Sequence, residues 1–471
     1  MIVGAGQAGE SLVRDLKRQG SALAPIVFLD DDPLKIGREI HGLPIMGPIE
    51  LLQTAVKRYE IDLVILAVPS APAAFVRKVV GLCEAIEIKV RTLPALNDLV
   101  QGLVTFDHLR EISLEDLLGR DPVKLDWPQI QANIQGSTVL VTGAGGSIGS
   151  ELCRQIAALK PETLVLLDNS EYNLFIIERE LQAKYPTVQL VAYLGSVTDP
   201  IALGTVFSTY RPKQVYHAAA YKHVPMLEGH WRAAAFNNVW GTWQVVQAAL
   251  AHQVEAFVLV STDKAVNPTN VMGLSKRIAE MICQAQDPTG TTRFMTVRFG
   301  NVLGSRGSVV EIFKQQIQQG VPLTITHPEM TRYFMTMQEA AQLILQAASL
   351  KHGGEICVLD MGEPLLIENL AAQLAKLAGK KLHTDVPVEY IGLRPGEKLH
   401  EELFHGKETL QPTTHRKILI AAKRSVPTHL YSTLVQLEYA IQEGEQAVRT
   451  LLCGLVPEYK TTTEETACAA R

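Results

Sequence analysis

One short pattern occurs twice in this chain, and it restricts the possible fold more than any other feature. An apolar run leads into closely spaced glycines and then into a helical segment, first over residues 2–16 and again over residues 138–158. A buried strand that enters a glycine turn and then a helix is typical of parallel α/β sheets that bind nucleotides at the turn. We therefore predict an α/β protein with two Rossmann-like, doubly wound parallel-sheet domains.

The first glycine turn has the spacing of a dinucleotide-binding loop. Gly4, Gly6 and Gly9 stand in GxGxxG order, and Asp30 ends the next apolar run, 21 residues after Gly9. An acidic residue at that place can accept ribose hydroxyls. The alternation of apolar and helical segments predicts a small α/β domain over residues 1–105. No catalytic motif follows this turn, so a regulatory, a structural and a ligand-binding role all stay open for this domain.

The rest of the chain predicts a connector, a larger domain and a tail. Residues 106–136 are polar and acidic, and Pro122 and Pro128 oppose a continuous helix there. From residue 137 to 425, apolar strands alternate with helical segments, which predicts a doubly wound parallel sheet followed by a small substrate-binding subdomain. The expected strands are TVLVTG, TLVLLD, QLVAYLG, QVYHAAA, AFVLVST and FMTVRFGN. We assign residues 426–471 to a C-terminal tail with one helix near residues 430–442.

Composition limits the partners and the compartment. The formal net charge is -5 and no basic tract is present, so we expect neither nucleic acid nor an anionic membrane as a partner. The six cysteines are far apart, without a CxxC pair or a histidine at ligand spacing, which indicates reduced thiols in the cytoplasm and no metal site. The longest apolar run is interrupted by prolines and shorter than the ~20 residues of a membrane span. Only three residues precede Gly4, which leaves room for a missing upstream segment; with a membrane segment there, the protein would be membrane-associated.

The second glycine turn is the stronger cofactor motif. Gly143, Gly146 and Gly149 permit a tight turn and close approach of a pyrophosphate to the helix start, which is formed by Ser147 and Ile148. Asp168 closes the next strand, 19 residues after Gly149. A carboxylate there can accept both ribose hydroxyls and would repel a 2′-phosphate. This turn therefore predicts NAD as the cofactor and disfavours NADP.

Six longer segments carry a resemblance to a known family. They are TGAGGSIGSEL (142–152), HAAAYKHVPMLE (217–228), STDKAVNPTNVMGLSK (261–276), RFGNVLGSRGSV (298–309), TRYFMT (331–336) and LRPGEKLHEEL (393–403). The region from 137 to 405 resembles the extended short-chain dehydrogenase/reductase family. Within it, the resemblance is to the capsule and O-antigen nucleotide-sugar 4,6-dehydratases that act on UDP-N-acetylglucosamine. The first 105 residues resemble the accessory nucleotide-binding domain of the large members of that group.

The resemblance implies roles for five residues. Asp263 would be the acid that protonates the departing carbon 6 hydroxyl, Lys264 the base at carbon 5, and Thr262 a partner of the carbon 4 oxygen. Lys276 would bind the nicotinamide ribose, and Met272 stands where the superfamily has a catalytic tyrosine. None of the twelve tyrosines has a lysine four residues later, and Met272 exchanges no proton. We expect burial near another cation to lower the pKa of Lys264 enough for it to act as a base.

Further residues are assigned to substrate and cofactor. By resemblance, Asn301 and Arg332 hold the sugar diphosphate and Lys222 approaches the sugar. For Arg394, a phosphate clamp and an ordinary surface ion pair are equally good interpretations. The family commonly has Gly-Asp-Val in the third strand, whereas this chain has Ser196 and Val197 after Gly195. Ser196 can still accept a hydrogen bond from the adenine amine, but the exchange weakens the expectation of tight cofactor binding.

These observations predict an NAD-dependent lyase. It would convert UDP-N-acetylglucosamine, or a related UDP-hexose, into a 4-keto-6-deoxy sugar nucleotide for polysaccharide synthesis in the cytoplasm. Two alternatives are a UDP-sugar 4-epimerase, which would ordinarily keep its tyrosine, and a non-catalytic nucleotide-sensing scaffold. The sequence leaves retention or inversion at carbon 5 open. By analogy with the family we expect a homo-oligomer that packs through the helical segment 231–253.

Overall fold

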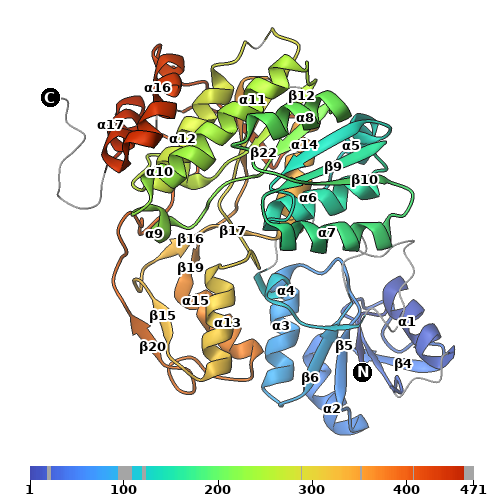
Figure 1. Cartoon of the computed structure of the whole chain (residues 1–471). Coiled ribbons are helices and arrows are strands. Elements are labelled where there is room, and N and C mark those ends of the chain that lie inside the picture. The colour runs from blue at the N-terminus through green and yellow to red at the C-terminus, as the bar shows by residue number, and fades with distance from the viewer. Residues whose placement is uncertain are drawn as a thin grey trace. The chain divides into compact units, whose positions relative to one another are not determined.

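The computed structural model describes residues 1–18, 23–93, 109–118, 123–287, 289–350, 353–406 and 408–460. The chain divides into two compact units, residues 1–122 with 373–381 and residues 123–372 with 382–471. Each unit contains a mostly parallel sheet with helices beside it, as the repeated glycine pattern predicts (Figure 1).

The described residues of the first unit form a seven-stranded sheet in the order β3-β4-β2-β1-β5-β6-β7. Its strands are β1 (Ile2–Val3), β2 (Phe28–Leu29), β3 (Glu39–Ile40), β4 (Leu43–Gly47), β5 (Leu63–Leu66), β6 (Lys89–Thr92) and β7 (Arg110–Glu111). Its helices are α1 (Gln7–Arg18), α2 (Leu52–Tyr59), α3 (Ala73–Glu84) and α4 (Leu114–Leu118). Alternate residues of β1 join different apolar clusters, Ile2 with Leu12 of α1 and Val3 with Val79 of α3, because successive strand residues point to opposite faces.

The described residues of the second unit form a nine-stranded sheet in the order β10-β9-β8-β11-β12-β13-β18-β22-β21. Its strands are β8 (Thr138–Thr142), β9 (Thr163–Asp168), β10 (Gln189–Leu194), β11 (Gln214–His217), β12 (Ala256–Val260), β13 (Arg293–Arg298), β18 (Glu355–Leu359), β21 (Leu410–Pro412) and β22 (Ile418–Ala421). All six strands expected from the sequence are present, and they follow the 3-2-1-4-5-6 order of doubly wound dinucleotide-binding sheets. The order reverses beside β8, so the carboxyl ends of β8 and β11 border the crevice where such sheets bind ligands.

Helices cover both faces of this sheet (Figure 1). One apolar cluster joins the sheet to α8 (Pro200–Tyr210), α11 (Gly241–Ala251) and α12 (Val271–Gln284). The other cluster joins it to α5 (Trp127–Ile134), α6 (Ser147–Ala158), α7 (Glu171–Lys184) and α14 (Met337–Ser349). A further helical run comprises α10 (Trp231–Ala234), a π-helix (Ala235–Trp240) and α11, which together span most of the segment expected to be one helix.

Beyond the main sheet, short paired strands form the region expected to bind substrate. β14 (Asn301–Val302) pairs with β17 (Phe334–Met335), β15 (Leu323–Ile325) with β20 (Val388–Tyr390), and β16 (Thr331–Arg332) with β19 (Leu365–Leu366). The remaining helices are α9 (Val224–Leu227), α13 (Val309–Gln319), α15 (Ile367–Leu377), α16 (Leu430–Glu443) and α17 (Glu445–Leu455).

Two predicted boundary segments are folded parts of the units. Within the expected connector 106–136, β7 pairs with β6, and Ile130 and Ile134 of α5 lie in the core of the second unit. Within the expected tail, Leu434 of α16 and Leu452 of α17 lie in that unit's other core cluster. Both segments therefore contribute buried apolar surface or strand pairing. Residues 101–108, 119–122 and 461–471 lie outside the described ranges.

The cysteines at positions 83, 153, 283 and 357 are buried and form no disulfide, as expected for core thiols, and burial raises the pKa of Cys83 to about 12. Cys468 lies outside the described residues. In the part of the chain that the structure describes, no helix is long and apolar enough to cross a membrane.

Candidate active site

The second glycine loop is shaped for close packing. Gly143 has φ +68°, and a Cβ atom there would lie 2.7 Å from Ala219 Cα. A Cβ atom on Gly149 would lie 1.9 Å from Gly143 O, so only glycine fits at either position. Gly146 precedes α6 as its N-cap, and no described side chain caps that helix. The first-turn N–H groups, from Ser147 onward, are thus open to an anion.

Asp168 ends β9 beside this loop. Its Oδ2 accepts the N–H of Gly145 and its Oδ1 accepts the N–H of Ser170, both at 2.8 Å. A carboxylate offers about four acceptor positions, so two remain for ribose hydroxyls. Asp168 therefore holds the loop in place and keeps acceptor capacity for a ligand.

The other expected cofactor residues have local structural roles as well. Ser196 Oγ lies 2.7 Å from Thr198 Oγ1 and accepts the Thr198 N–H, so this hydroxyl shapes its own turn. Val197 is buried in the core, where a Cβ atom on Gly241 would lie 2.8 Å from its Cγ2. Ile148 is partly buried and packs against the other core cluster.

The run Thr262, Asp263 and Lys264 forms a single turn after the carboxyl end of β12. Thr262 Oγ1 donates to Asp263 Oδ1 at 2.8 Å, and Lys264 Nζ donates to the same oxygen at 3.0 Å. Lys264 Nζ also donates to Asn301 Oδ1 at 3.0 Å. Asp263 is fully buried, and its Oδ2 has no hydrogen-bond partner among the described residues. The turn is therefore a compact acid–base pair with one open carboxylate oxygen.

Glu401 completes this cluster, and the sequence analysis did not single it out. Its Oε1 lies 3.6 Å from Lys264 Nζ and 3.8 Å from Arg332 Nε. The Glu401 side chain is only 3% exposed, and its Oε2 has no hydrogen-bond partner among the described residues. Glu401 belongs to the motif LRPGEKLHEEL, in which Arg394 was the predicted site residue. The motif ends with four charged side chains, and its local pattern does not show which of them is buried: Glu397, Lys398, Glu401 and Glu402.

The predicted direction of the Lys264 pKa shift is wrong. Burial does act to lower the pKa of Lys264, and the charge of Arg332 acts in the same direction. The carboxylates of Asp263 and Glu401 outweigh both and raise this pKa above its usual value. Lys264 is therefore an ammonium group at neutral pH in this structure, paired with carboxylates.

Helix α12 positions the other two expected residues. It begins at Val271, after Asn270, whose Oδ1 accepts the Gly273 N–H at 2.7 Å. Met272 is buried in the apolar core, in agreement with its having no part in proton transfer. Lys276 Nζ donates to Val260 O at 2.7 Å, and burial lowers the pKa of Lys276 to about 8. Lys276 therefore contacts the last residue of β12, and the Asp263–Lys264 pair follows that strand closely in the chain.

The expected substrate residues divide into two groups. Asn301 and Arg332 join the Lys264 cluster, and Arg332 is buried with its Nη2 3.6 Å from Glu397 Oε1. Lys222 and Arg394 are exposed, and neither forms an ion pair with a described residue. Arg394 is connected to the cluster only through its main chain, whose N–H donates to Glu397 Oε2 at 3.2 Å.

The first unit repeats the loop geometry of the second. Gly4 has φ +105°, and a Cβ atom on Gly9 would lie 2.1 Å from Gly4 O. Asp30 Oδ2 accepts the Ala5 N–H at 2.7 Å and its Oδ1 accepts the Asp32 N–H at 3.0 Å. Gly6 has open space around it. The two loops differ in one respect. Lys35 Nζ forms an ion pair with Asp30 Oδ2 at 3.1 Å, whereas Asp168 forms no ion pair with any described residue.

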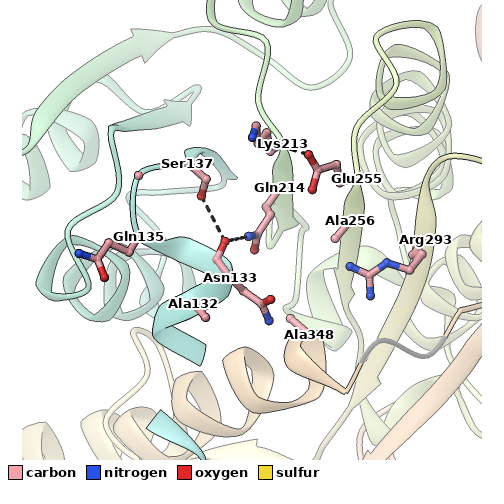
Figure 2. Close-up of a pocket in the computed structure, with 11 residues that line it drawn as sticks. Ala132, Asn133, Gln135, Ser137, Lys213, Gln214, Glu255, Ala256, Arg293 and Ala348 are labelled. Carbon is pink, nitrogen blue, oxygen red and sulfur yellow. Dashed lines mark hydrogen bonds and ion pairs between the residues drawn. The ribbon is translucent and has the colours of Figure 1, made fainter. Parts of the chain in front are cut away.

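A separate pocket lies at the amino ends of strands in the second sheet, away from the candidate site. Figure 2 shows its lining, in which Gln214 Nε2 and Ser137 Oγ both donate to Asn133 O. Lys213 lies 3.8 Å from Glu255 at the pocket rim. These residues precede or begin β8, β11 and β12, whereas the candidate site lies at the carboxyl ends of those strands. The pocket is therefore distinct from the cluster around Lys264.

Two known families together match most of the residues of the chain. Residues 139–423 match the polysaccharide biosynthesis protein family, and residues 1–94 match the CoA-binding domain. The chain is 43% identical over 422 residues to the capsular polysaccharide biosynthesis protein CapD of Staphylococcus aureus, which covers 89% of this chain and 70% of CapD. It is 34% identical over 278 residues to UDP-glucose 4-epimerase of Rickettsia massiliae, which covers 58% of this chain and 78% of the epimerase.

Solved structures have a fold similar to that of a large part of this chain. Pen from Bacillus thuringiensis has a TM-score of 0.56 and 30% sequence identity, covering 61% of this chain and 89% of Pen. A double mutant of DesIV, a dTDP-glucose 4,6-dehydratase from Streptomyces venezuelae solved with NAD bound, has a TM-score of 0.50 and 22% identity, covering 57% of this chain and 88% of DesIV. The second likeness is one of fold alone.

Proposed function

The chain belongs to the polysaccharide biosynthesis protein family, and we propose that it is an NAD-dependent 4,6-dehydratase of UDP-N-acetylglucosamine or a related UDP-hexose. The observation that carries this proposal is the buried contact of Lys264 Nζ with Asp263 Oδ1 at the carboxyl end of β12. Dehydration across carbons 5 and 6 needs a base and an acid within reach of one sugar. This pair offers both on adjacent residues.

The glycine loop of the second unit fits a dinucleotide. Gly143 and Gly149 leave no room for side chains, the N-terminus of α6 is open to a pyrophosphate, and Asp168 retains acceptor positions for a ribose. Lys276 would hold the nicotinamide ribose. Bound NAD supplies the hydride acceptor and donor that the reaction needs at carbons 4 and 6. The lack of an ion pair at Asp168 within the described ranges favours an unphosphorylated ribose.

Lys264 can act as a base despite its raised pKa because it can pass its proton to Asp263. In the charged form, that proton resides on Lys264 and Asp263 is a carboxylate. Its transfer across the 3.0 Å contact gives a neutral amine and a carboxylic acid without any change in total charge. Exclusion of water by a bound sugar favours this neutral form, since separated charges are costly in a dry site.

The neutral pair can then act on both carbons. The Lys264 amine takes the proton from carbon 5, and the carboxylic acid of Asp263 protonates the hydroxyl that leaves carbon 6 as water. The proton that crosses the contact with Lys264 lies on Oδ1 of Asp263, so Oδ1 is the atom that delivers it. The pair returns to its charged form in the same step.

A UDP-sugar 4-epimerase is the nearest alternative, because the chain is 34% identical to a UDP-glucose 4-epimerase over 278 residues. Both reactions take the carbon 4 hydroxyl proton as hydride leaves, and with Met272 buried at the tyrosine position Thr262 Oγ1, which donates to Asp263 Oδ1, would pass this proton on. Only the dehydratase also needs an acid for carbon 6, which the Asp263–Lys264 pair offers. The site therefore supports the dehydratase better.

We propose a second nucleotide site at Gly4, Gly6, Gly9 and Asp30 in the first unit. The match to the CoA-binding domain and the carboxylate contacts with Ala5 and Asp32 support it. Lys35 beside Asp30 is a cation that suits a ligand with a phosphorylated ribose. We also propose a homo-oligomer formed through residues 231–253. The proposed domain limits are 1–105, 106–136, 137–425 and 426–471.

Proton NMR tests the main proposal. The purified protein is incubated with UDP-N-acetylglucosamine in heavy water without added cofactor. A new upfield methyl signal, with deuterium at carbon 5, is the expected result. An equatorial carbon 4 proton without a methyl signal would indicate an epimerase, because that proton is axial in the substrate. An unchanged substrate, also with added NAD and with other UDP-hexoses, would favour a nucleotide-sensing scaffold.

A further inference from the structure

Arg306 lies against the glycine loop although it comes from a distant segment, residues 301–308. Its main-chain N–H donates to Ser147 Oγ at 3.1 Å. Its Nη1 donates to Gly145 O at 3.3 Å and to Asn173 Oδ1 on α7. A guanidinium group is thus held beside the N-terminus of α6, where the helix dipole and the open N–H groups already favour an anion.

Arg306 is exposed, so solvent rather than a neighbouring carboxylate compensates its charge. Both acceptors of its Nη1 are neutral oxygens, one from a backbone carbonyl and one from a carboxamide. Within the described ranges, the guanidinium forms no ion pair with a carboxylate. The open helix N-terminus and this exposed cation without a carboxylate partner both favour a ligand with negative charge at the same loop.

The segment that carries Arg306 is held by contacts at both ends. At its start, Asn301 Oδ1 accepts from Lys264 Nζ at 3.0 Å. At its end, Gly307 has φ +67°, and a Cβ atom there would lie 2.7 Å from His223 Cε1. The Gly307 N–H donates to Glu311 Oε2 at 2.6 Å. Arg306 is consequently presented to the glycine loop by a braced segment that also contacts the catalytic pair.

We propose that Arg306 pairs with the pyrophosphate of the bound dinucleotide and slows its release. This inference rests on the dinucleotide site proposed above and adds a residue that the glycine motif does not contain. Guanidinium has five N–H donors, so Arg306 can keep a contact to Gly145 or Asn173 while it binds phosphate oxygens. The proposed reaction returns the hydride to the same sugar, so the dinucleotide need not leave between turnovers and long retention does not limit the rate.

The test compares cofactor retention in R306Q, R306K and the unaltered full chain. We measure the NAD content of each purified protein after acid release, and the rate at which bound NAD is lost on dilution into a NAD-free buffer. We expect R306Q to lose NAD roughly 10- to 100-fold faster, as for the loss of a charge-assisted hydrogen bond, with R306K in between. R179Q is the matched control, since Arg179 is exposed on α7 and stacks on Phe175.

Three outcomes are decisive. Faster NAD loss from R306Q but not from R179Q, with equal thermal unfolding of the NAD-free proteins, supports the role of Arg306. Equal retention by R306Q and the unaltered chain overturns it and leaves the dinucleotide site intact. An unaltered chain that neither contains NAD nor binds it in a calorimetric titration overturns the dinucleotide site itself, and the role of Arg306 with it.

Discussion

Glu401 and Lys264 face each other inside the second unit, with 3.6 Å between Oε1 and Nζ. Glu401 Oε1 also lies 3.8 Å from Arg332 Nε, so this buried carboxylate forms ion pairs with two cations. Buried charges are screened little by solvent, and the Glu401 charge therefore acts strongly on Lys264. This relationship connects the segment 393–403 to the proposed acid–base pair.

The first prediction concerns the pH profile of E401Q. Glu401 raises the pKa of Lys264, so its replacement by a neutral amide lowers that pKa. Loss of the shared proton from the Asp263–Lys264 pair then occurs at lower pH, and the alkaline limb of kcat/KM moves to lower pH. Glu402 is exposed and pairs with Lys398, so E402Q is the control and keeps the original profile. An E401Q profile that matches the control would refute the positioning role of Glu401.

The second prediction separates the acid from the base. D263N removes the acid, whereas K264M removes the base, and each should lower dehydration by roughly 10²- to 10⁴-fold. Only D263N retains Lys264, whose pKa falls when the Asp263 charge is lost, so its amine can still exchange the carbon 5 proton. Deuterium uptake into recovered substrate in heavy water, followed by NMR, should persist in D263N and vanish in K264M. The opposite pattern would reverse the two roles.

The third prediction concerns stability in acid. His217 is fully buried between Thr142 and Thr242, and burial lowers its pKa to about 3 from an ordinary 6.5. Between these values the unfolded chain binds the proton and the folded chain does not, so stability falls as the pH drops below 6.5. The loss is about 1 kcal/mol per pH unit for one proton.

Urea unfolding at several pH values measures this effect. H217Q cannot titrate and should show a smaller decline between pH 6.5 and 4 than the unaltered chain. H252Q, at an exposed histidine, should decline as the unaltered chain does. Equal slopes for H217Q and the unaltered chain would mean that His217 is not the source.

The fourth prediction concerns the buried ion pair behind the site. Glu280 of α12 accepts from Arg298 Nε at 3.1 Å and Nη2 at 2.8 Å, and from Ser261 Oγ at 2.7 Å. Both charged side chains are fully buried. Glu280 also pairs with buried Arg277 at 3.3 Å. E280Q therefore reduces the compensation of two buried cations, although Arg298 keeps Glu408, and it should lower the free energy of unfolding by about 3–5 kcal/mol. Chemical denaturation measures this change, and a loss below about 1 kcal/mol, typical of exposed pairs, would contradict it.

Local features of the sequence were reliable guides to the elements. The six predicted strands are present, and the helix after the second glycine turn begins at Ser147 as expected. Such features depend on residues close in the chain, namely apolar periodicity, glycine spacing and capping side chains. The connector was harder to predict because β7 and α5 gain stability from partners outside the segment, in β6 and α14.

By itself, the sequence determined the parallel α/β architecture, both glycine loops and the placement of Asp263 and Lys264 at a strand end. Only the tertiary structure decided that Glu401 turns toward Lys264 and that Arg306 lies on the loop after β8. It also decided the direction of the Lys264 pKa shift. That direction is the balance of opposing effects of burial and of charges brought from distant segments, and this balance depends on distances that only long-range packing sets.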